Sequence, residues 1–137
     1  MDYAVWNTLH DGGVESVIGN VPGDVSVLIH IPYLCQKLPT DSKALEIRLR
    51  NCTRFEYEPF EGDVLTNPTE LAACGIEILS ADQKDGFISV VCVGGSLRLI
   101  YKDVEIRLLD GKVISQAELE DAAVRYWADW STKHASK

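Results

Sequence analysis

The sequence lacks the long apolar runs and the leader segment that mark membrane and secreted proteins. None of its apolar runs approaches the roughly 18 to 20 residues that a membrane-spanning helix needs. Its first residues, Met1-Asp-Tyr-Ala4, have neither the positively charged region nor the apolar core of a signal peptide. We therefore expect a cytoplasmic location and no membrane partner. The length of 137 residues predicts one globular domain spanning residues 1–137.

Cysteine is scarce and never closely paired. The four cysteines, Cys35, Cys52, Cys74 and Cys92, include no C-x-x-C pair. Zinc sites usually show such closely spaced ligands, and disulfides are rare in a reducing compartment. The spacing therefore predicts small buried side chains, and we expect neither a bound metal nor another cofactor.

Positive charge is also in short supply. The chain has 13 lysines and arginines against 21 aspartates and glutamates, which gives a net charge of −8. Binding to a phosphate backbone needs clustered basic residues. We therefore expect no nucleic-acid partner.

The acidic residues are concentrated in one part of the chain. Between residues 55 and 85, a single lysine opposes eight acidic residues. These are Glu56, Glu58, Glu61, Asp63, Glu70, Glu77, Asp82 and Asp85. A well-solvated surface is the simplest interpretation, and the alternative is an acidic face that steers a basic protein partner. For that alternative the candidate binding residues are Glu56, Glu58, Glu61 and Asp63.

No signature of a catalytic site is present. The sequence contains no G-x-S-x-G nucleophile turn, and Gly94-Gly95-Ser96 lacks the lysine and the following helix of a phosphate-binding loop. Glu56 and Glu58 share one face of a predicted strand, but that face is charged and turned to solvent. The chain is therefore predicted to bind rather than to catalyse.

What the sequence does contain is the stretch from Trp6 to Val17, in which a histidine, an aspartate and two glycines follow a tryptophan. His10 and Asp11 are the candidate catalytic residues, as a general base with a neighbouring carboxylate. Adjacent side chains diverge on a strand and reach each other only in a turn. Asp11-Gly12 is itself typical of a turn, in which Asp11 accepts a backbone amide and Gly12 takes a positive φ.

We therefore interpret this stretch first as a folding element. Trp6 and Leu9 are expected to anchor the N-terminus on the core, while residues 11–13 turn the chain into its first strand. The alternative is a small-molecule pocket beside His10 and Asp11. Adding His30 would give a metal-binding set, but the spacing does not favour one.

Alternating apolar and polar residues predict several antiparallel strands. The alternation covers residues 25–31 and a long stretch over 45–58, for which we expect a bend or bulge near Asn51-Cys52. In the run over 97–109 the apolar parity slips, which predicts a bulge or a turn at Lys102-Asp103.

Two helices are predicted from their capping residues. Asn67 and Pro68 start a short helix that ends near Gly75. Ser115 and Glu118 form a capping box for a C-terminal helix. Its apolar stripe, at helical spacing, comprises Leu119, Ala122, Ala123, Tyr126, Trp127 and Trp130. We expect this stripe to dock on the sheet rather than to serve as an aromatic ligand platform.

The opening motif, Trp6 followed by Leu9-His-Asp-Gly and an apolar strand, resembles the start of several small bacterial β-rich families. Many of these are uncharacterised, and some are classed with immunity proteins of toxin systems. The resemblance implies a curved antiparallel sheet or sandwich and binding rather than catalysis, and it carries over no functional residue. Such immunity proteins are commonly acidic because the toxins that they block are often basic, and the acidic stretch of this chain fits that pattern.

These patterns together predict a β-rich α+β fold. We expect an antiparallel β-sandwich or strongly curved sheet of roughly six to eight strands, with one short helix and a C-terminal helix packed on it. The predicted function is that of a non-enzymatic, immunity-like protein-binding module whose acidic face docks a basic partner. The alternative is a small-molecule-binding protein or an enzyme with a pocket near His10 and Asp11. The patterns do not indicate an oligomeric state.

Overall fold

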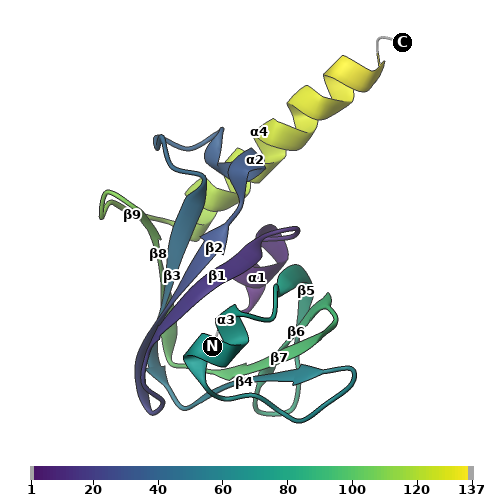
Figure 1. Ribbon diagram of the computed structural model, residues 1–137. Helices are drawn as coiled ribbons and strands as arrows, with labels where there is room; N and C mark the ends of the chain where they lie inside the picture. Colours follow the sequence, from purple (N-terminus) through teal and green to yellow (C-terminus); the bar gives the residue numbers. More distant parts are fainter. Residues whose placement is uncertain (1, 136–137) are drawn as a thin grey trace.

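The computed structural model describes residues 2–135, whose strands form one curved antiparallel sheet (Figure 1). The strands are β1 (Gly13–Gly19), β2 (Gly23–His30), β3 (Ala44–Cys52), β4 (Arg54–Pro59), β5 (Glu77–Gln83), β6 (Ile88–Val93), β7 (Gly95–Ile100), β8 (Asp103–Leu108) and β9 (Val113–Ile114). The helices are α1 (Ala4–Thr8), α2 (Pro32–Cys35), α3 (Pro68–Ala72) and α4 (Gln116–Ala135). The strands lie in the order β4-β7-β6-β5-β1-β2-β3-β8-β9, which confirms the predicted β-rich α+β class.

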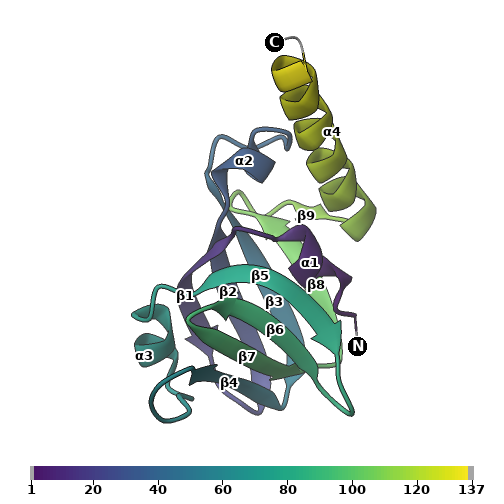
Figure 2. The same ribbon diagram turned by 90° about the vertical axis from the view of Figure 1, so that its right-hand side faces the viewer.

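The curvature comes from two long strands that are each broken by a bend. β3 runs almost directly into β4, and β7 into β8, yet β3 pairs with β8 while β4 pairs with β7 (Figures 1 and 2). The bends face each other, because the Thr53 amide donates to the Ile100 carbonyl at 2.8 Å and the Lys102 amide to the Arg50 carbonyl at 2.9 Å. Asn51 takes a left-handed φ of 50° at the first bend. Both irregularities are confirmed where the sequence pattern predicted them.

One curved sheet, rather than a two-sheet sandwich, therefore surrounds the core. It has nine strands, more than expected, partly because each bend divides a long predicted strand into two. Among residues 2–135, no helix combines the length and the apolar character that crossing a membrane requires.

The first residues are anchored in the core as predicted. Trp6 and Leu9 are fully buried, and the Trp6 indole Nε1 donates to the Tyr101 hydroxyl at 3.2 Å. Trp6 lies on α1, a short helix that the alternation did not predict, and Leu9 follows as its C-cap. The chain then turns and enters β1 at Gly13.

Both predicted helices begin at their predicted caps. At the start of α3, the Asn67 side-chain oxygen accepts the amides of Thr69 at 2.9 Å and Glu70 at 3.2 Å. At the start of α4, the Ser115 hydroxyl accepts the Glu118 amide at 3.0 Å. These bonds satisfy amides that have no partner within the first turn of a helix.

Among its described residues, the C-terminal helix α4 has its buried apolar side chains only in its first half. Leu119 and Ala122 are buried, and the helix contacts α1 and α2. Further along, α4 projects away from the sheet (Figures 1 and 2). Trp127 is 44% exposed and Trp130 is 45% exposed. The expectation that these two tryptophans dock on the sheet is therefore wrong, since the body ends before the apolar stripe does.

Candidate functional site

His10 and Asp11 lie half-exposed in the turn between α1 and β1. The His10 Nε2 is 3.4 Å from Asp11 Oδ1, so the two side chains meet, as neighbours can in a turn. The His10 Nδ1 is 2.7 Å from the carbonyl oxygen of Leu79. Because a carbonyl can only accept, this nitrogen carries the proton. What disfavours His10 as a general base toward a substrate is its position, because it does not line the depression beside this turn.

The same segment covers an open edge of β5. The Asn7 side chain donates to the Ala81 carbonyl at 3.1 Å and accepts the Ala81 amide at 2.8 Å. The Asp11 amide donates to the Ile78 carbonyl at 2.8 Å, and the His10 ring adds the bond described above. These contacts satisfy backbone groups that a neighbouring strand would otherwise pair. They give the His10 and Asp11 segment a structural role.

The conformation of this turn differs from the prediction at two residues. Asp11, rather than Gly12, takes the left-handed φ, at 69°. The Asp11 carboxylate pairs with His10, and no bond from it to a backbone amide is present in the described residues. Gly12 is needed for space, because a Cβ there would lie 2.7 Å from Ile29 Cγ2 and 2.9 Å from the Leu9 carbonyl oxygen.

The surface beside this turn is a shallow depression of about 370 Å³. Asp11, Glu15 and His30 contribute to its lining, and the His30 Nδ1 lies 3.0 Å from Glu15 Oε1. His10 is not among the lining residues. In the part of the chain that the structure describes, no group of three or more histidine, cysteine or acidic side chains is arranged to hold a metal ion.

The first two acidic candidates are already paired with arginines. Glu56 and Glu58 lie on the outer face of β4, where they were predicted. The Glu56 Oε1 accepts from the Arg54 Nε at 2.8 Å and Nη2 at 2.6 Å. It also lies 3.8 Å from Arg98, which pairs with Glu58. These four side chains form a network of balanced charge, so this face is not the open acidic surface that the sequence suggested.

The other two acidic candidates, Glu61 and Asp63, are exposed in the loop between β4 and α3. Two apolar side chains of the same loop, Phe60 and Val64, are exposed at 76% and 43%. The structure thus separates the four candidates into a neutralised pair on the sheet and a free pair in a loop. The acidic surface that they offer is small.

Three of the four cysteines behave as predicted. Cys35, Cys52 and Cys92 are buried free thiols, and Cys74 is an exposed free thiol, contrary to the expectation. Burial raises the pKa of Cys35 and of Cys92 to about 11. Since the thiolate is the nucleophile, these two groups are poorly suited to nucleophilic catalysis.

Sequence reasoning considered the α4 stripe as an aromatic platform but set that aside, and it did not foresee that Tyr33 joins it. The four rings, here called the aromatic face, are the partly buried Tyr33 and Tyr126 and the exposed Trp127 and Trp130. The Tyr33 ring centroid lies 4.8 Å from that of Tyr126 and 5.9 Å from that of Trp127. The ring centroids of Trp127 and Trp130 lie 6.1 Å apart. The Tyr33 hydroxyl donates to the His10 carbonyl at 2.5 Å, which ties the aromatic face to the turn after α1. Burial, followed by nearby negative charge, raises the pKa of Tyr33 to about 12.

Polar contacts hold the projecting helix in place beneath these rings. Lys37, just after α2, pairs with Asp129 of α4. The Arg125 Nη2 donates to the Lys37 carbonyl at 2.7 Å, and its Nε donates to Asp121 at 2.8 Å. Together with the packing of Tyr33 on Tyr126, these contacts hold this part of α4 beside α2. The only sequence signal for this arrangement was the length of the apolar stripe, which periodicity alone assigned to the core.

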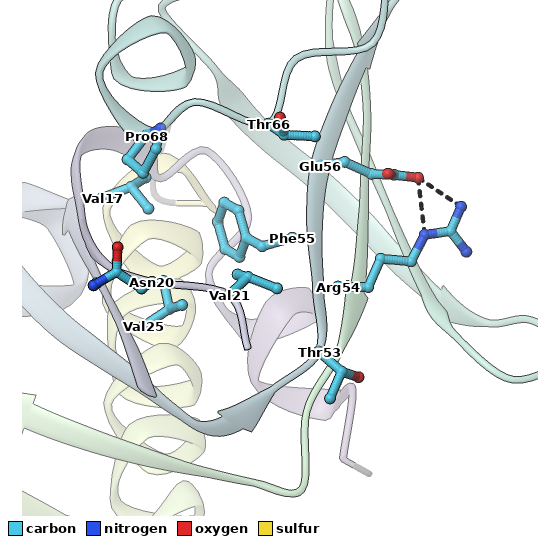
Figure 3. Close-up of a pocket in the computed structure, with 11 residues that line it drawn as sticks. Val17, Asn20, Val21, Val25, Thr53, Arg54, Phe55, Glu56, Thr66 and Pro68 are labelled. Atoms are coloured by element: carbon cyan, nitrogen blue, oxygen red, sulfur yellow. Dashed lines mark hydrogen bonds and ion pairs between the residues drawn. The ribbon is translucent and has the colours of Figure 1, made fainter. Parts of the chain in front are cut away.

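A second feature absent from the sequence analysis is a pocket of about 390 Å³ at one end of the sheet (Figure 3). The β1–β2 turn, β4 and the segment that leads into α3 provide its walls. Val17, Val25 and Phe55 form an apolar floor, and all three are buried. No periodicity could reveal this pocket, because it exists only where three distant segments meet.

Comparison of the chain with protein-family models, curated proteins and solved structures found no match.

Proposed function

We propose that this protein is a non-enzymatic protein-binding module that docks a basic partner through the aromatic face. The observation that carries the proposal is the exposure of Trp127 and Trp130, 44% and 45%, on a helix that projects beyond the sheet. Tryptophan and tyrosine supply large contact areas at a low entropic cost, and they are enriched among the residues that dominate binding energy.

The polar contacts of α4 support this use of the aromatic face. Lys37 and Arg125 fix the helix against the body, so a partner would meet rings that are already positioned. Such preorganisation lowers the entropic cost of association. Half-exposed tryptophans that cluster on a surface are typical of interaction sites, since an uncovered apolar patch is otherwise a liability.

Charges of both signs lie beside the rings: Lys37, Lys133 and Asp129 line the surface next to Tyr126 and Trp130, and Asp11 and Glu120 supply further carboxylates. Asp11 lies close enough to Tyr33 to raise the pKa of that phenol. Glu120 precedes Trp127 by two helical turns on the same side of α4, and its carboxylate accepts the Gln116 side-chain amide at 3.0 Å. In the described residues, neither carboxylate is paired with a lysine or arginine. A partner's basic side chains could therefore stack on the rings and pair with these carboxylates.

Catalysis has less support than binding. His10 does not line the depression beside its turn, the Cys35 and Cys92 thiols are buried with raised pKa values, and Glu56 and Glu58 are paired with arginines. The net charge of −8 and the immunity-like resemblance of the opening motif fit the same class of basic partner.

The test is affinity capture from a lysate of the native host, with the wild type and with a Trp127→Ser/Trp130→Ser variant as baits. Removing two such anchors should weaken binding of the partner by about 2 kcal/mol or more, which is roughly 30-fold in Kd. The variant should then retain no partner. Raising the salt concentration should release the partner from the wild type, because exposed charges are screened.

The matched control is Val91→Ser/Val93→Ser, which replaces two exposed apolar residues of β6, at 41% and 51% exposure. This variant should retain the partner. A Glu61→Lys/Asp63→Lys variant tests the acidic loop instead. The proposal would be overturned if the tryptophan variant still retained the partner while the loop variant did not. A wild-type dimer that the tryptophan variant converts to a monomer would also overturn it, since the occupant would then be a second copy.

A further inference from the structure

We infer that the pocket at the end of the sheet is a binding site for a small neutral molecule with an apolar body and one hydrogen-bonding group. The pocket holds about 390 Å³ and is lined by the β1–β2 turn, β4 and the segment before α3 (Figure 3). Volumes of about 300–1,000 Å³ are usual for small-molecule sites. The inference is independent of the aromatic face.

The interior of the pocket is apolar on three sides. The Phe55 ring points into it, with Val17 and Val25 across the floor and Val21 at the β1–β2 turn (Figure 3). Pro68, the first residue of α3, closes the upper wall. Apolar side chains from opposite walls are what an aromatic or aliphatic ligand body would contact, and its burial there is favourable in proportion to the area removed from water.

The lining carries no unpaired charge. Arg54 and Glu56 line the pocket, but their side chains point away from Phe55 and pair with each other (Figure 3). A charged ligand would have to give up its hydration without an opposite charge to replace it, which is costly. The site therefore favours a neutral molecule.

Two polar side chains at the rim are free to bind a ligand. Asn20 and Thr66 both line the pocket, one on the turn and one on the opposite segment, and both are exposed. Neither side chain makes a hydrogen bond or ion pair within the described residues. The amide offers a donor and an acceptor, and the hydroxyl offers the same. A ligand held on the apolar floor could therefore satisfy one of these groups without displacing an existing bond.

The wall formed by the β1–β2 turn is fixed in shape. Gly19 has a φ of 132°, and a Cβ there would lie 2.3 Å from the Asp24 carbonyl oxygen. The Asp24 carboxylate accepts the Asn51 amide at 3.0 Å, which ties the turn to the bend between β3 and β4. This wall is therefore held in place before a ligand binds, which lowers the ordering entropy that binding costs.

The experiment is a titration with N-phenyl-1-naphthylamine, a neutral aromatic probe with one N–H group, followed by its fluorescence. We expect saturable binding at one site. Val21→Trp and Thr66→Trp, which fill the pocket from opposite walls at exposed positions, should each abolish it. The control Ile18→Trp places the same ring at an exposed position outside the pocket lining, at 69% exposure, and should bind as the wild type does. Thermal melting establishes that every variant is folded.

Two further variants separate this site from the aromatic face. Asn20→Ala should raise the Kd of the probe by roughly 2- to 10-fold if the amide supplies the hydrogen bond. Thr66→Val should raise it by a similar factor if the hydroxyl supplies the bond. The Trp127→Ser/Trp130→Ser variant should leave probe binding unchanged. Binding that is lost in the tryptophan variant, or that persists in both pocket-filling variants, would overturn the inference while leaving the proposed partner untouched. No saturable binding by the wild type would also overturn it.

Discussion

At the scale of single residues, the turn after α1 shows how a reactive-looking sequence can serve the fold. His10 and Asp11 are chemically suited to acid–base work, yet the structure directs the imidazole to a backbone carbonyl and to the neighbouring carboxylate. Composition predicted a turn here correctly. It could not predict that Asp11 rather than Gly12 takes the left-handed conformation, because the need for glycine comes from Ile29, on another strand.

Gly12→Ala should lower the free energy of unfolding by about 1–3 kcal/mol. The added methyl would lie 2.7 Å from Ile29 and 2.9 Å from a backbone oxygen, which overpacks the core. Gly13→Ala is the matched control, since its Cβ would meet only the Ile76 carbonyl oxygen, at 3.9 Å. Urea unfolding of both variants measures the difference. Equal stability of the two would show that the close approach at Gly12 is not a constraint.

At the scale of elements, β5 depends on side chains rather than on a strand along part of its edge. β1 pairs with β5 at Gly13 and Glu77, and beyond that point Asn7 takes the place of a strand by bonding both backbone groups of Ala81. Strand edges left open invite pairing with other chains. The segment before β1 therefore protects the sheet as well as anchoring it.

Asn7→Ala should destabilise the protein by about 1–2 kcal/mol, because two hydrogen bonds are lost at once. The effect should be concentrated at the β5 edge. Hydrogen exchange read by NMR should show faster exchange of the Ala81 amide, which the Asn7 side chain accepts. The Ile78 amide, bonded to the Gly12 carbonyl, is the internal control and should change less. A uniform change at both amides would contradict a local edge contact.

The elements themselves were largely predictable, while their docking was not. Asn67 and Ser115 identified the starts of α3 and α4 because capping is local chemistry. The length of the alternating stretch predicted the bend between β3 and β4, and a slip in apolar parity predicted the one between β7 and β8. Trp127 and Trp130 were assigned to the core because periodicity reports which side of a helix is apolar, but not whether the body extends far enough to cover it.

At the scale of the whole molecule, buried thiols and phenols make the free energy of unfolding depend on pH in the alkaline range. Burial raises the pKa of Cys35 and Cys92 from 9.0 to about 11, and that of Tyr33 from 10.0 to about 12. Burial is also the main cause of the raised pKa values of Cys52, Tyr57 and Tyr101. In each case the unfolded chain loses its proton at a lower pH than the folded protein does.

The contribution of these groups to the free energy of unfolding should therefore be steady below about pH 9 and fall as the pH rises from 9 toward 12. Each group that is ionised only in the unfolded chain contributes a slope of about 1.4 kcal/mol per pH unit. Urea midpoints measured between pH 7 and 11 under reducing conditions, for the wild type and for Cys35→Ala, provide the test. The variant should show a shallower decline, and a flat profile for the wild type would contradict the assignment.

The sequence alone predicted the fold class better than any site. Alternation and capping depend on near neighbours, so they can be read from the chain directly. The pocket and the aromatic face arise where Phe55 meets the β1–β2 turn and where Tyr33 meets α4, and such meetings are set by topology. Among the four acidic candidates, Glu56 and Glu58 were neutralised by arginines whose proximity only the sheet register creates.

The two bent strands also govern how the chain must fold. Leu45 pairs with Leu108 and Arg54 with Ile100, so the central ladder joins segments that are far apart in sequence. Contacts of this kind form only after long loops have closed, and the entropic cost of closing them comes before the contacts stabilise the chain. Folding is therefore slower than for helical proteins of the same size. During synthesis, Asn7 emerges long before Ala81, the residue it will seal. The segment that covers this edge is therefore already available when β5 is made, so β5 can pair as it forms without leaving that part of its edge open to other chains.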